Sequence, residues 1–384
     1  MNVPPMASVF PQEIFDQIID DSWRDAETLR QCALTCHAWL PRSRLNLFST
    51  AVLRRSDQLH KFSRALSSST EAAALVQELI LAPPYKVKPA FINSALIALA
   101  SKLPRVRKLC LVRPPFAWPD KRGSLSIPLR LVEFITRFST LTHVVLVDLS
   151  FASFLDLVHI VTALPNLTAL DCRALDWGDQ AMVPHDSPMR QAGSLSLGSL
   201  AVTGSWNALH GISMLFRAVN VESLKSLTVD SNAGSSDDFE TFLDVLQSYT
   251  ALETFTIANL YFPWSDNLSA MHETIKCVLG SLSSSSLRRI CLDFTQAMGR
   301  SRHEIVETAT IMSAVAEDSL SASKFAGVEI LVRVADKAES ESWWVAEMEA
   351  AFWGLYTRGV LRVQVCDTWG HHPTEEVRYE DGAV

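Results

Sequence analysis

The sequence contains no long hydrophobic run. A membrane-spanning helix needs about 18 or more consecutive apolar residues without charge, and the apolar stretch 151–164 is interrupted by Asp156 and His159. The N-terminus also lacks a basic region followed by an apolar core, which is the pattern of a secretory signal. We therefore expect a protein of the cell interior, cytoplasmic or nuclear, with no membrane partner.

Cysteine is scarce, and basic residues are not in excess. Seven cysteines are scattered among 384 residues, and an odd number argues against a complete disulfide framework and favours a reducing compartment. The 34 basic and 42 acidic residues give a net charge of −8, whereas binding to a phosphate backbone needs clustered lysine and arginine. We therefore expect no nucleic-acid partner.

The motifs of common enzymes are missing as well. There is no Gly-x-Ser-x-Gly elbow, no His-Glu-x-x-His helix and no phosphate-binding loop. Cys32 and Cys36 beside His37, and Cys366 near His371–His372, are the groups that come nearest to a metal site, but neither has four ligands at paired short spacings. We expect a chain that is not an enzyme, with no catalytic residue, metal or cofactor.

The N-terminal fifty residues carry the most informative pattern. Pro11 suits the first turn of a helix, because its fixed φ fits there and its missing N–H costs nothing. A second amphipathic stretch runs from residue 27 to residue 39. Helices this short cannot bury much surface alone, so they need a neighbour in the chain or a partner. The apolar residues at helical spacing are Ile14, Phe15, Ile18, Ile19, Leu29, Cys32, Ala33, Cys36 and Trp39.

This segment, about residues 9–50, resembles an F-box, with Phe10-Pro11 in place of the usual Leu-Pro and Thr35 where valine is usual. Trp39, Arg42, Ser43 and Arg44, followed by Leu47-Phe48, match the end of the motif. The resemblance implies docking to the Skp adaptor of a Skp–cullin–F-box ubiquitin ligase and, through that adaptor, to a cullin. The residues that would carry the docking are Phe10, Pro11, Ile14, Ile18, Leu29, Leu34 and Trp39.

The remainder of the chain repeats a short pattern with apolar residues at its first, fourth and sixth positions. Leu141, Val144 and Leu146 show it, and successive repeats start 26 to 35 residues apart. Amphipathic helical stretches lie between the repeats, and a strand alternating with a helix at this period indicates a βα solenoid. The repeats start at Val76, Val106, Leu141, Leu167, Leu197, Leu224, Leu252 and Leu287.

These segments are similar to leucine-rich repeats, whose pattern is Leu-x-x-Leu-x-Leu-x-x-Asn/Cys-x-Leu. The ninth position is Asn only at Asn232, and Leu149, Leu175 and Leu260 occupy it elsewhere, which predicts an irregular solenoid. The expected fold class is therefore α/β, an F-box-like helical module followed by an irregular leucine-rich-repeat-like solenoid. The expected domains are 1–50, the F-box-like module; 51–75, a linker helix; 76–366, the solenoid, with further strands at 328–334 and 360–365; and 367–384, a polar tail.

A doubly wound α/β fold is the second architecture that alternates strands and helices. Its strands are covered on both faces and should be almost continuously apolar. Here the intervening positions are often polar, as at Ser226, Thr254 and Thr256, and no Gly-x-Gly-x-x-Gly loop follows an early strand. One open face favours the solenoid.

In a leucine-rich solenoid the residues between the buried strand positions lie on the concave face. Carried over to this sequence, the early part of that face is apolar, and exposed apolar patches often mark partner surfaces. The alternative is that a loop or tail of the same chain covers these residues. The candidates for substrate contact, including two tryptophans of loops at the rim, are Ile80, Val112, Val145, Val147, Asp171, Arg173, Trp118 and Trp264.

An aromatic residue also recurs nine or ten residues after the start of most repeats. We interpret this position as core rather than as a ring of binding residues, because it corresponds to the buried leucine of the repeat pattern. The residues are Tyr85, Phe116, Phe151, Trp177, Trp206 and Phe262.

The sequence leaves two principal functions open. The first is a substrate-recognition adaptor of a ubiquitin ligase, whose solenoid captures a protein. The second is a protein-interaction scaffold not linked to ubiquitination, whose N-terminal helices pack on its own first repeat. Burial distinguishes them: the second needs the apolar face of residues 10–39 to meet Leu53, Leu59, Phe62 and Leu66. An enzyme on an α/β fold would instead need a deep pocket with converging polar groups.

Overall fold

The computed structural model describes residues 11–23, 25–84, 90–113, 132–179, 193–204, 209–230, 239–260, 268–295, 301–320 and 325–366. Within these residues, one parallel sheet of eleven strands follows the order of the chain, and β5 (Ser150–Ser153) pairs with β7 (Asp176–Asp179) beside it. The strands of the large sheet are β1 (Thr50–Leu53), β2 (Glu78–Leu81), β3 (Lys108–Val112), β4 (His143–Val147), β6 (Ala169–Arg173), β8 (Ser199–Thr203), β9 (Ser226–Asp230), β10 (Thr254–Ala258), β11 (Arg289–Asp293), β12 (Glu329–Ala335) and β13 (Leu361–Cys366).

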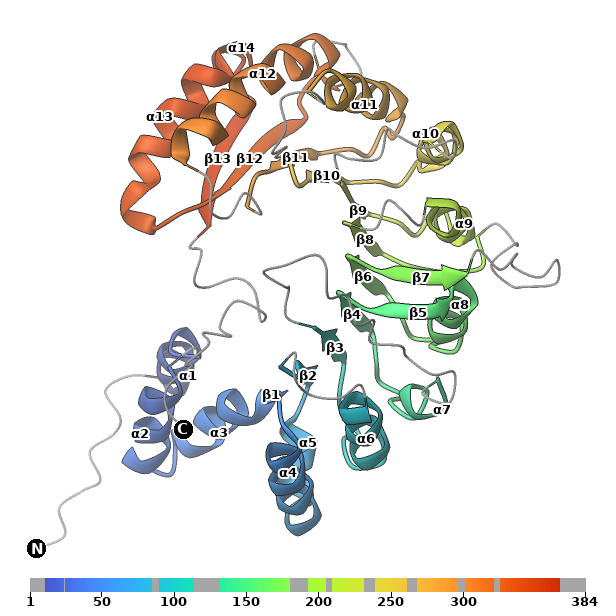
Figure 1. Cartoon of the computed structure of the whole chain (residues 1–384). Helices are drawn as coiled ribbons and strands as arrows, with labels where there is room; N and C mark the ends of the chain where they lie inside the picture. Colours follow the sequence, from blue (N-terminus) through green and yellow to red (C-terminus); the bar gives the residue numbers. More distant parts are fainter. Residues whose placement is uncertain are drawn as a thin grey trace, which may run out of the picture.

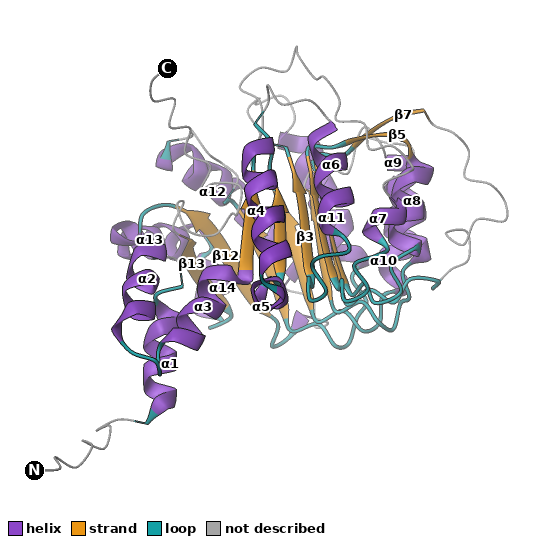
Figure 2. Cartoon of the chain, turned by 90° about the horizontal axis from the view of Figure 1, so that it is seen from below, coloured by secondary structure: helices purple, strands orange, loops and turns teal. Residues whose placement is uncertain are grey.

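The sheet lines the inside of an arc, and the helices that alternate with its strands lie on the outside (Figure 1). Three N-terminal helices form a separate group at the β1 end of the arc (Figures 1 and 2). This one-sided arrangement is that of a solenoid and not of a doubly wound sheet. The helices are α1 (Gln12–Asp21), α2 (Ala26–Thr35), α3 (Leu40–Ser49), α4 (Ser56–Ser68), α5 (Thr70–Leu75), α6 (Ala90–Leu99), α7 (Val132–Ile135), α8 (Phe154–Thr162), α9 (Leu209–Ala218), α10 (Phe239–Ser248), α11 (Leu268–Ser281), α12 (Arg302–Leu320), the 3₁₀ turn η8 (Ala338–Ser340), α13 (Glu341–Ala351) and α14 (Trp353–Thr357).

The apolar pattern of the repeats sets the register of the sheet. Residues at the fourth position of each predicted repeat are direct partners in neighbouring strands, and the sixth positions form a second column in the same way. Burial of both columns supplies the main hydrophobic stabilisation of the stack. The fourth-position column, at most 2% exposed, is Leu79, Leu109, Val144, Leu170, Leu200, Leu227, Phe255 and Ile290.

Several strands are followed by a residue in the left-handed backbone conformation, where the chain turns sharply. We call this turn the left-handed corner. Asp148, Ala174, Gly204 and Asn259 have φ values of 53°, 49°, 68° and 55°, and each occupies the eighth position of its repeat. The corner turns the ninth residue into the interior, so Leu149, Leu175 and Leu260 are 1%, 4% and 0% exposed.

A buried carboxylate ties two of these corners to the strand between them. Asp230 accepts a hydrogen bond from the Gly204 backbone N–H at 2.8 Å and another from the Asn259 side-chain amide at 2.6 Å. A polar side chain thus bridges three repeats here, where a regular solenoid would use an asparagine ladder. Asn232, the asparagine that fits the repeat pattern, lies outside the described residues.

The sheet begins earlier than the sequence predicts. The segment 51–75, expected as a single linker helix, contains most of β1 followed by α4 and α5. β1 extends both buried columns, because Ala51 pairs with Leu79 and Leu53 with Leu81. Alanine at the fourth position hides this repeat from a leucine-based pattern. The solenoid therefore starts at Thr50 and not at residue 76.

The core position of the recurring aromatics is confirmed for Phe151, whereas Trp177 is only partly buried. Phe151 is 1% exposed, and Trp177 packs against the core with its ring 5.2 Å from that of Phe154. Both lie on the small β5–β7 sheet, which the sequence did not predict. Tyr85, Phe116, Trp206 and Phe262 lie outside the described residues.

The strands expected at 328–334 and 360–365 are present as β12 and β13. Trp344, 1% exposed, anchors the last helices by donating its indole N–H to Asp336 at 2.7 Å. Arg302 pairs with the same carboxylate at 2.8 Å.

No helix within the described part of the chain has the length and apolar character needed to cross a membrane.

Candidate functional site

The N-terminal module is built from three short helices with distinct start signals. α1 follows Pro11, and α2 is capped by the Asp25 carboxylate, which accepts the backbone N–H groups of Glu27 and Thr28, both at 3.0 Å. Ile19 and Leu29, each 1% exposed, fill the centre of the module. Both N-terminal helical stretches expected from the sequence are present, but the second ends at Thr35 and not at residue 39, because the backbone of Cys36 is extended. A third helix follows them.

A polar cluster fastens α1 to α3. Arg42 Nε donates to Asp20 Oδ1 at 2.6 Å, and its second guanidinium nitrogen bonds the other carboxylate oxygen. Asn46 Nδ2 adds a bond of 3.0 Å to Asp20 Oδ1 and one of 3.3 Å to the Ile19 carbonyl. The Arg42 hydrogen bond holds the pKa of Asp20 below its usual value, and Asp20 correspondingly raises the pKa of Arg42. The cluster fixes the angle between the two helices.

The outer faces of α1 and α2 present large apolar side chains to solvent. Ile14, Ile18 and Leu34 are 48%, 54% and 81% exposed. Ile14 and Ile18 are one helical turn apart and so lie on the same face of α1. We call these three residues the exposed apolar face. Exposed apolar side chains that gather on one surface often mark a site that meets a partner, whereas scattered ones are common on any protein.

The other residues expected to dock are placed differently. Pro11 is exposed, whereas Trp39 is half-buried with its ring 5.4 Å from that of Phe15. Leu29 is buried and stabilises the module from within, so in this conformation it offers no surface to a partner. Phe10 lies outside the described residues.

The first repeat has its own packing partners. Leu53, Leu59 and Leu66 belong to the core that runs through the solenoid, with Phe62 packed against it. Of the module, α3 contacts this end of the solenoid through α5 and β1. The first repeat therefore does not bury the exposed apolar face, which is the burial that the scaffold hypothesis requires.

The early concave face is apolar, as predicted, but most of it is not accessible. Ile80 and Val112 are each 2% exposed and form a small cluster with Ala82 and Cys110, separate from the main core. Two further residues expected to contact substrate, Val145 and Val147, are half-buried and pack against this cluster. Ile80 and Val112 therefore supply almost no surface, and Val145 and Val147 supply part of theirs. Trp118 and Trp264 lie outside the described residues.

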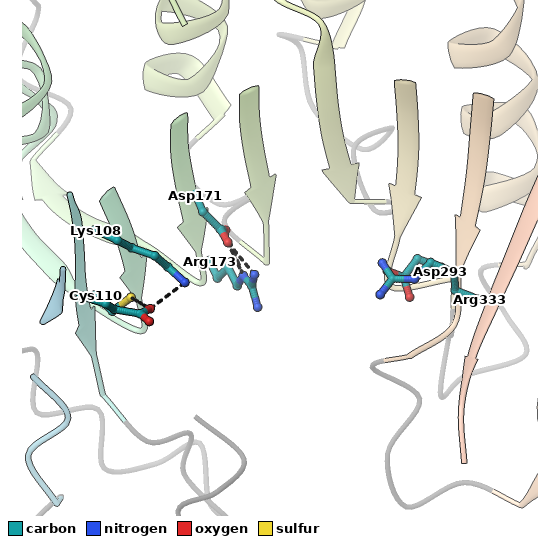
Figure 3. A network of polar contacts seen from close by, with 7 residues as sticks. Lys108, Cys110, Asp171, Arg173, Asp293 and Arg333 are labelled. Carbon is teal, nitrogen blue, oxygen red and sulfur yellow. Dashed lines mark hydrogen bonds and ion pairs between the residues drawn. The ribbon is translucent and has the colours of Figure 1, made fainter. Parts of the chain in front are cut away.

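Ion pairs follow the apolar cluster along the concave face (Figure 3). Asp171 and Arg173, both predicted substrate contacts, bond each other, with Arg173 Nε 2.9 Å from Asp171 Oδ1. Glu78 pairs with Lys108 at 2.7 Å, and Asp293 pairs with Arg333 at 3.1 Å. These charged side chains are therefore paired with one another within the chain.

The pKa values on this face follow from burial and pairing. Burial disfavours the charged form of Lys108, but the hydrogen bond to Glu78 and nearby negative groups outweigh it and raise the Lys108 pKa. Burial raises the pKa of the Cys110 and Cys291 thiols, each to about 12. A thiol with such a pKa stays protonated near neutral pH and is a poor nucleophile or metal ligand. No group of three or more potential metal ligands occurs among the residues that the structure places.

A cluster of three charged side chains on this face was predicted only in part. Glu329 accepts from Arg289 at 2.5 Å and from Arg362 at 2.7 Å, so two guanidinium groups share one carboxylate across β11, β12 and β13. The sequence placed Arg289 on the concave face, but it gave no register for the last two strands. The other two members were therefore missed.

The fold and its surfaces define a class: an α/β repeat protein of solenoid type with a helical module at its N-terminal end. No family model and no curated protein matches this sequence. Among solved structures, one that is similar is the crystal structure of the Rad7 and Elc1 complex in yeast. The sequence identity is 11% and the TM-score is 0.35. The match covers 84% of this chain and 87% of the chain in that structure. A likeness at this level carries no argument about function.

Proposed function

We propose that this chain is a non-catalytic adaptor: its N-terminal module docks to the Skp adaptor of a Skp–cullin–F-box ubiquitin ligase, and its solenoid captures a protein substrate. The exposed apolar face of Ile14, Ile18 and Leu34 is the observation that carries the proposal. It lies within the segment whose sequence resembles an F-box. Burial of these side chains in a complex would contribute stabilisation in proportion to the apolar area removed from water.

The arrangement of the two parts suits such a role. The helical module lies at the β1 end of the arc, and the sheet carries the concave face away from it (Figure 1). A subunit of this shape can hold a substrate near an enzyme that is bound through the module. It would act by raising local concentration and not by chemistry of its own.

The direct test is binding of a purified Skp adaptor to the full chain and to Ile18→Asp. A charge at this position would have to be desolvated in the complex, so we expect binding to weaken at least tenfold, on the order of 1.4 kcal/mol. Ile97→Asp is the matched control, because Ile97 is 52% exposed on α6 and Ile18 is 54% exposed on α1. Calorimetric titration measures both, and unfolding midpoints verify that the variants fold.

Binding that is lost in Ile18→Asp and kept in Ile97→Asp supports adaptor docking through this face. A full chain that does not bind the Skp adaptor contradicts it, and the protein is then better described as an interaction scaffold outside ubiquitination. Equal losses in the two variants would place the contact elsewhere.

A further inference from the structure

The last strand of the sheet has an open edge. β13 pairs with β12 on one side, and among the described residues no strand pairs with its other side. Figure 1 shows it at the end of the arc opposite to β1. An edge strand presents a row of N–H and C=O groups that can pair with another strand.

The hydrogen bonds to β12 identify the groups on the open edge. Ile330 N–H donates to the Val360 carbonyl at 2.8 Å, and Asp336 N–H donates to the Cys366 carbonyl at 3.0 Å. The even-numbered residues of β13 therefore bond to β12. Because bonding alternates along a strand, the N–H and C=O groups of Leu361, Val363 and Val365 point to the open edge.

The side chains of β13 alternate in the same way. Leu361, Val363 and Val365 are half-buried and pack against the main core, whereas Arg362 and Gln364 are exposed on the concave side. The strand thus has one apolar side, continuous with the core and incompletely covered, and one polar side.

We propose that β13 pairs in antiparallel fashion with β13 of a second copy of this chain, about a two-fold axis at Val363. With this centre Val363 lies opposite its own copy and Leu361 lies opposite Val365. Residues that face each other as hydrogen-bonded pairs exchange both backbone bonds, so every open-edge group of these residues in both copies gains a partner. The half-buried apolar side chains of the two copies then meet on one side of a continuous sheet.

The polar side of β13 fits the same register. Arg362 of each copy lies opposite Gln364 of the other, so no like charges face each other across the pair. Arg362 is 74% exposed and can donate to the opposed amide oxygen while it remains near Glu329. Such an interface is self-complementary and closed, as a two-fold dimer requires.

The other edge of the sheet, β1, is less suited to pairing. β1 has only four residues. The backbone N–H groups of Gln77 and Ala82 donate to the carbonyls of Ser49 and Leu53, so the odd-numbered residues at this end bond to β2. The open edge of β1 therefore offers the backbone groups of Thr50 and Val52.

Two exposed aromatic residues lie on α14, the helix that leads into β13. Trp353 and Tyr356 are 62% and 42% exposed, and their ring centroids are 5.6 Å apart. Exposed aromatics of this kind are frequent at interfaces.

Opposite charge substitutions at Gln364 test the register. Gln364→Glu places a carboxylate opposite Arg362 of the second copy and should tighten the dimer, whereas Gln364→Arg places like charges opposite each other and should weaken it. Because the interface contains this pair twice, we expect each dissociation constant to shift roughly 2- to 30-fold, in opposite directions. Ser68→Arg, at an exposed residue of α4, adds the same charge far from β13 and should leave the dimer unchanged.

Sedimentation equilibrium of the full chain over a wide concentration range measures these constants, and circular dichroism verifies that each variant is folded. A concentration-dependent dimer with the two opposite shifts supports the proposal. A monomer at every concentration overturns it. A dimer that both Gln364 variants leave unchanged, or that Ser68→Arg weakens equally, also overturns it.

Discussion

Single residues decide how the N-terminal module is held together. Asp20 accepts bonds from both Arg42 and Asn46, and its lowered pKa shows that the folded module favours the carboxylate over the acid. Ile14 and Ile18, two of the three residues of the exposed apolar face, lie on α1, and this cluster fastens α1 to α3. The placement of these two side chains and the local stability of the module therefore depend on the same carboxylate.

This coupling predicts a pH dependence. The folded pKa of Asp20 is lowered, so its contribution to stability is present above the unfolded value of about 3.9 and is lost as pH falls through the folded value. We expect Asp20→Asn to lower the free energy of unfolding at pH 7 by about 1 kcal/mol or less, because the ion pair is partly exposed. Urea unfolding of both proteins from pH 7 to pH 3 should show this difference shrinking below pH 4.

Asp57→Asn is the control for this prediction. Asp57 pairs with Arg55, but both side chains are at least half exposed, so its removal should change little at any pH. A difference between wild type and Asp20→Asn that stays constant down to pH 3 would contradict the assignment.

At the scale of elements, the left-handed corners decide where each strand ends. Gly204 takes this conformation with φ 68°, and a Cβ added to it would lie 3.3 Å from the backbone N of Ala174 in the neighbouring corner. Ala174 itself has φ 49°. Two successive repeats thus place their corners in contact, and one of the two residues must be small.

We therefore expect Gly204→Ala to lower the free energy of unfolding by roughly 1–3 kcal/mol, since a side chain in the left-handed region is strained and here also meets a close neighbour. Gly198→Ala, at the opposite end of β8, is the matched control. Its φ is not positive and its added Cβ would meet the Thr168 carbonyl at an ordinary 3.6 Å. Denaturant midpoints compare the two variants, and equal effects would argue against strain at the corner.

At the scale of the whole molecule, the parallel sheet makes each repeat depend on its neighbours. β9 lies between β8 and β10, and its residue Leu227 is 0% exposed. In such a stack stability is close to a sum of repeat terms and nearest-neighbour interfaces. Damage to one repeat should therefore spread to adjacent repeats before distant ones.

Leu227→Ala tests this expectation. Truncation of a buried leucine lowers the free energy of unfolding by about 2–5 kcal/mol. We expect hydrogen-exchange protection to fall most in β8, β9 and β10, and less in β2 and β12. Lys225→Ala, at a largely exposed side chain of the same repeat, should leave protection nearly unchanged. A uniform loss across the sheet would indicate that the whole solenoid unfolds as one unit.

The sequence by itself determined the repeats and their register. A spacing of apolar residues at positions one, four and six specifies which side chains of a strand are buried, and the paired columns from Leu79 to Ile290 follow it. It also identified the N-terminal helices, because Pro11 and the apolar residues after it are local signals. These features depend on neighbours along the chain, which a sequence displays directly.

Only the tertiary structure decided which apolar residues are covered. Ile18 and Leu29 have the same chemistry and lie on adjacent helices, yet one is 54% exposed and the other 1%. Ile80 lies on the face expected to be open and is buried, and β1 joins the sheet through Ala51, where the repeat pattern expects leucine. Burial depends on contacts between segments distant in the chain, and the periodicity of a single segment does not contain that information.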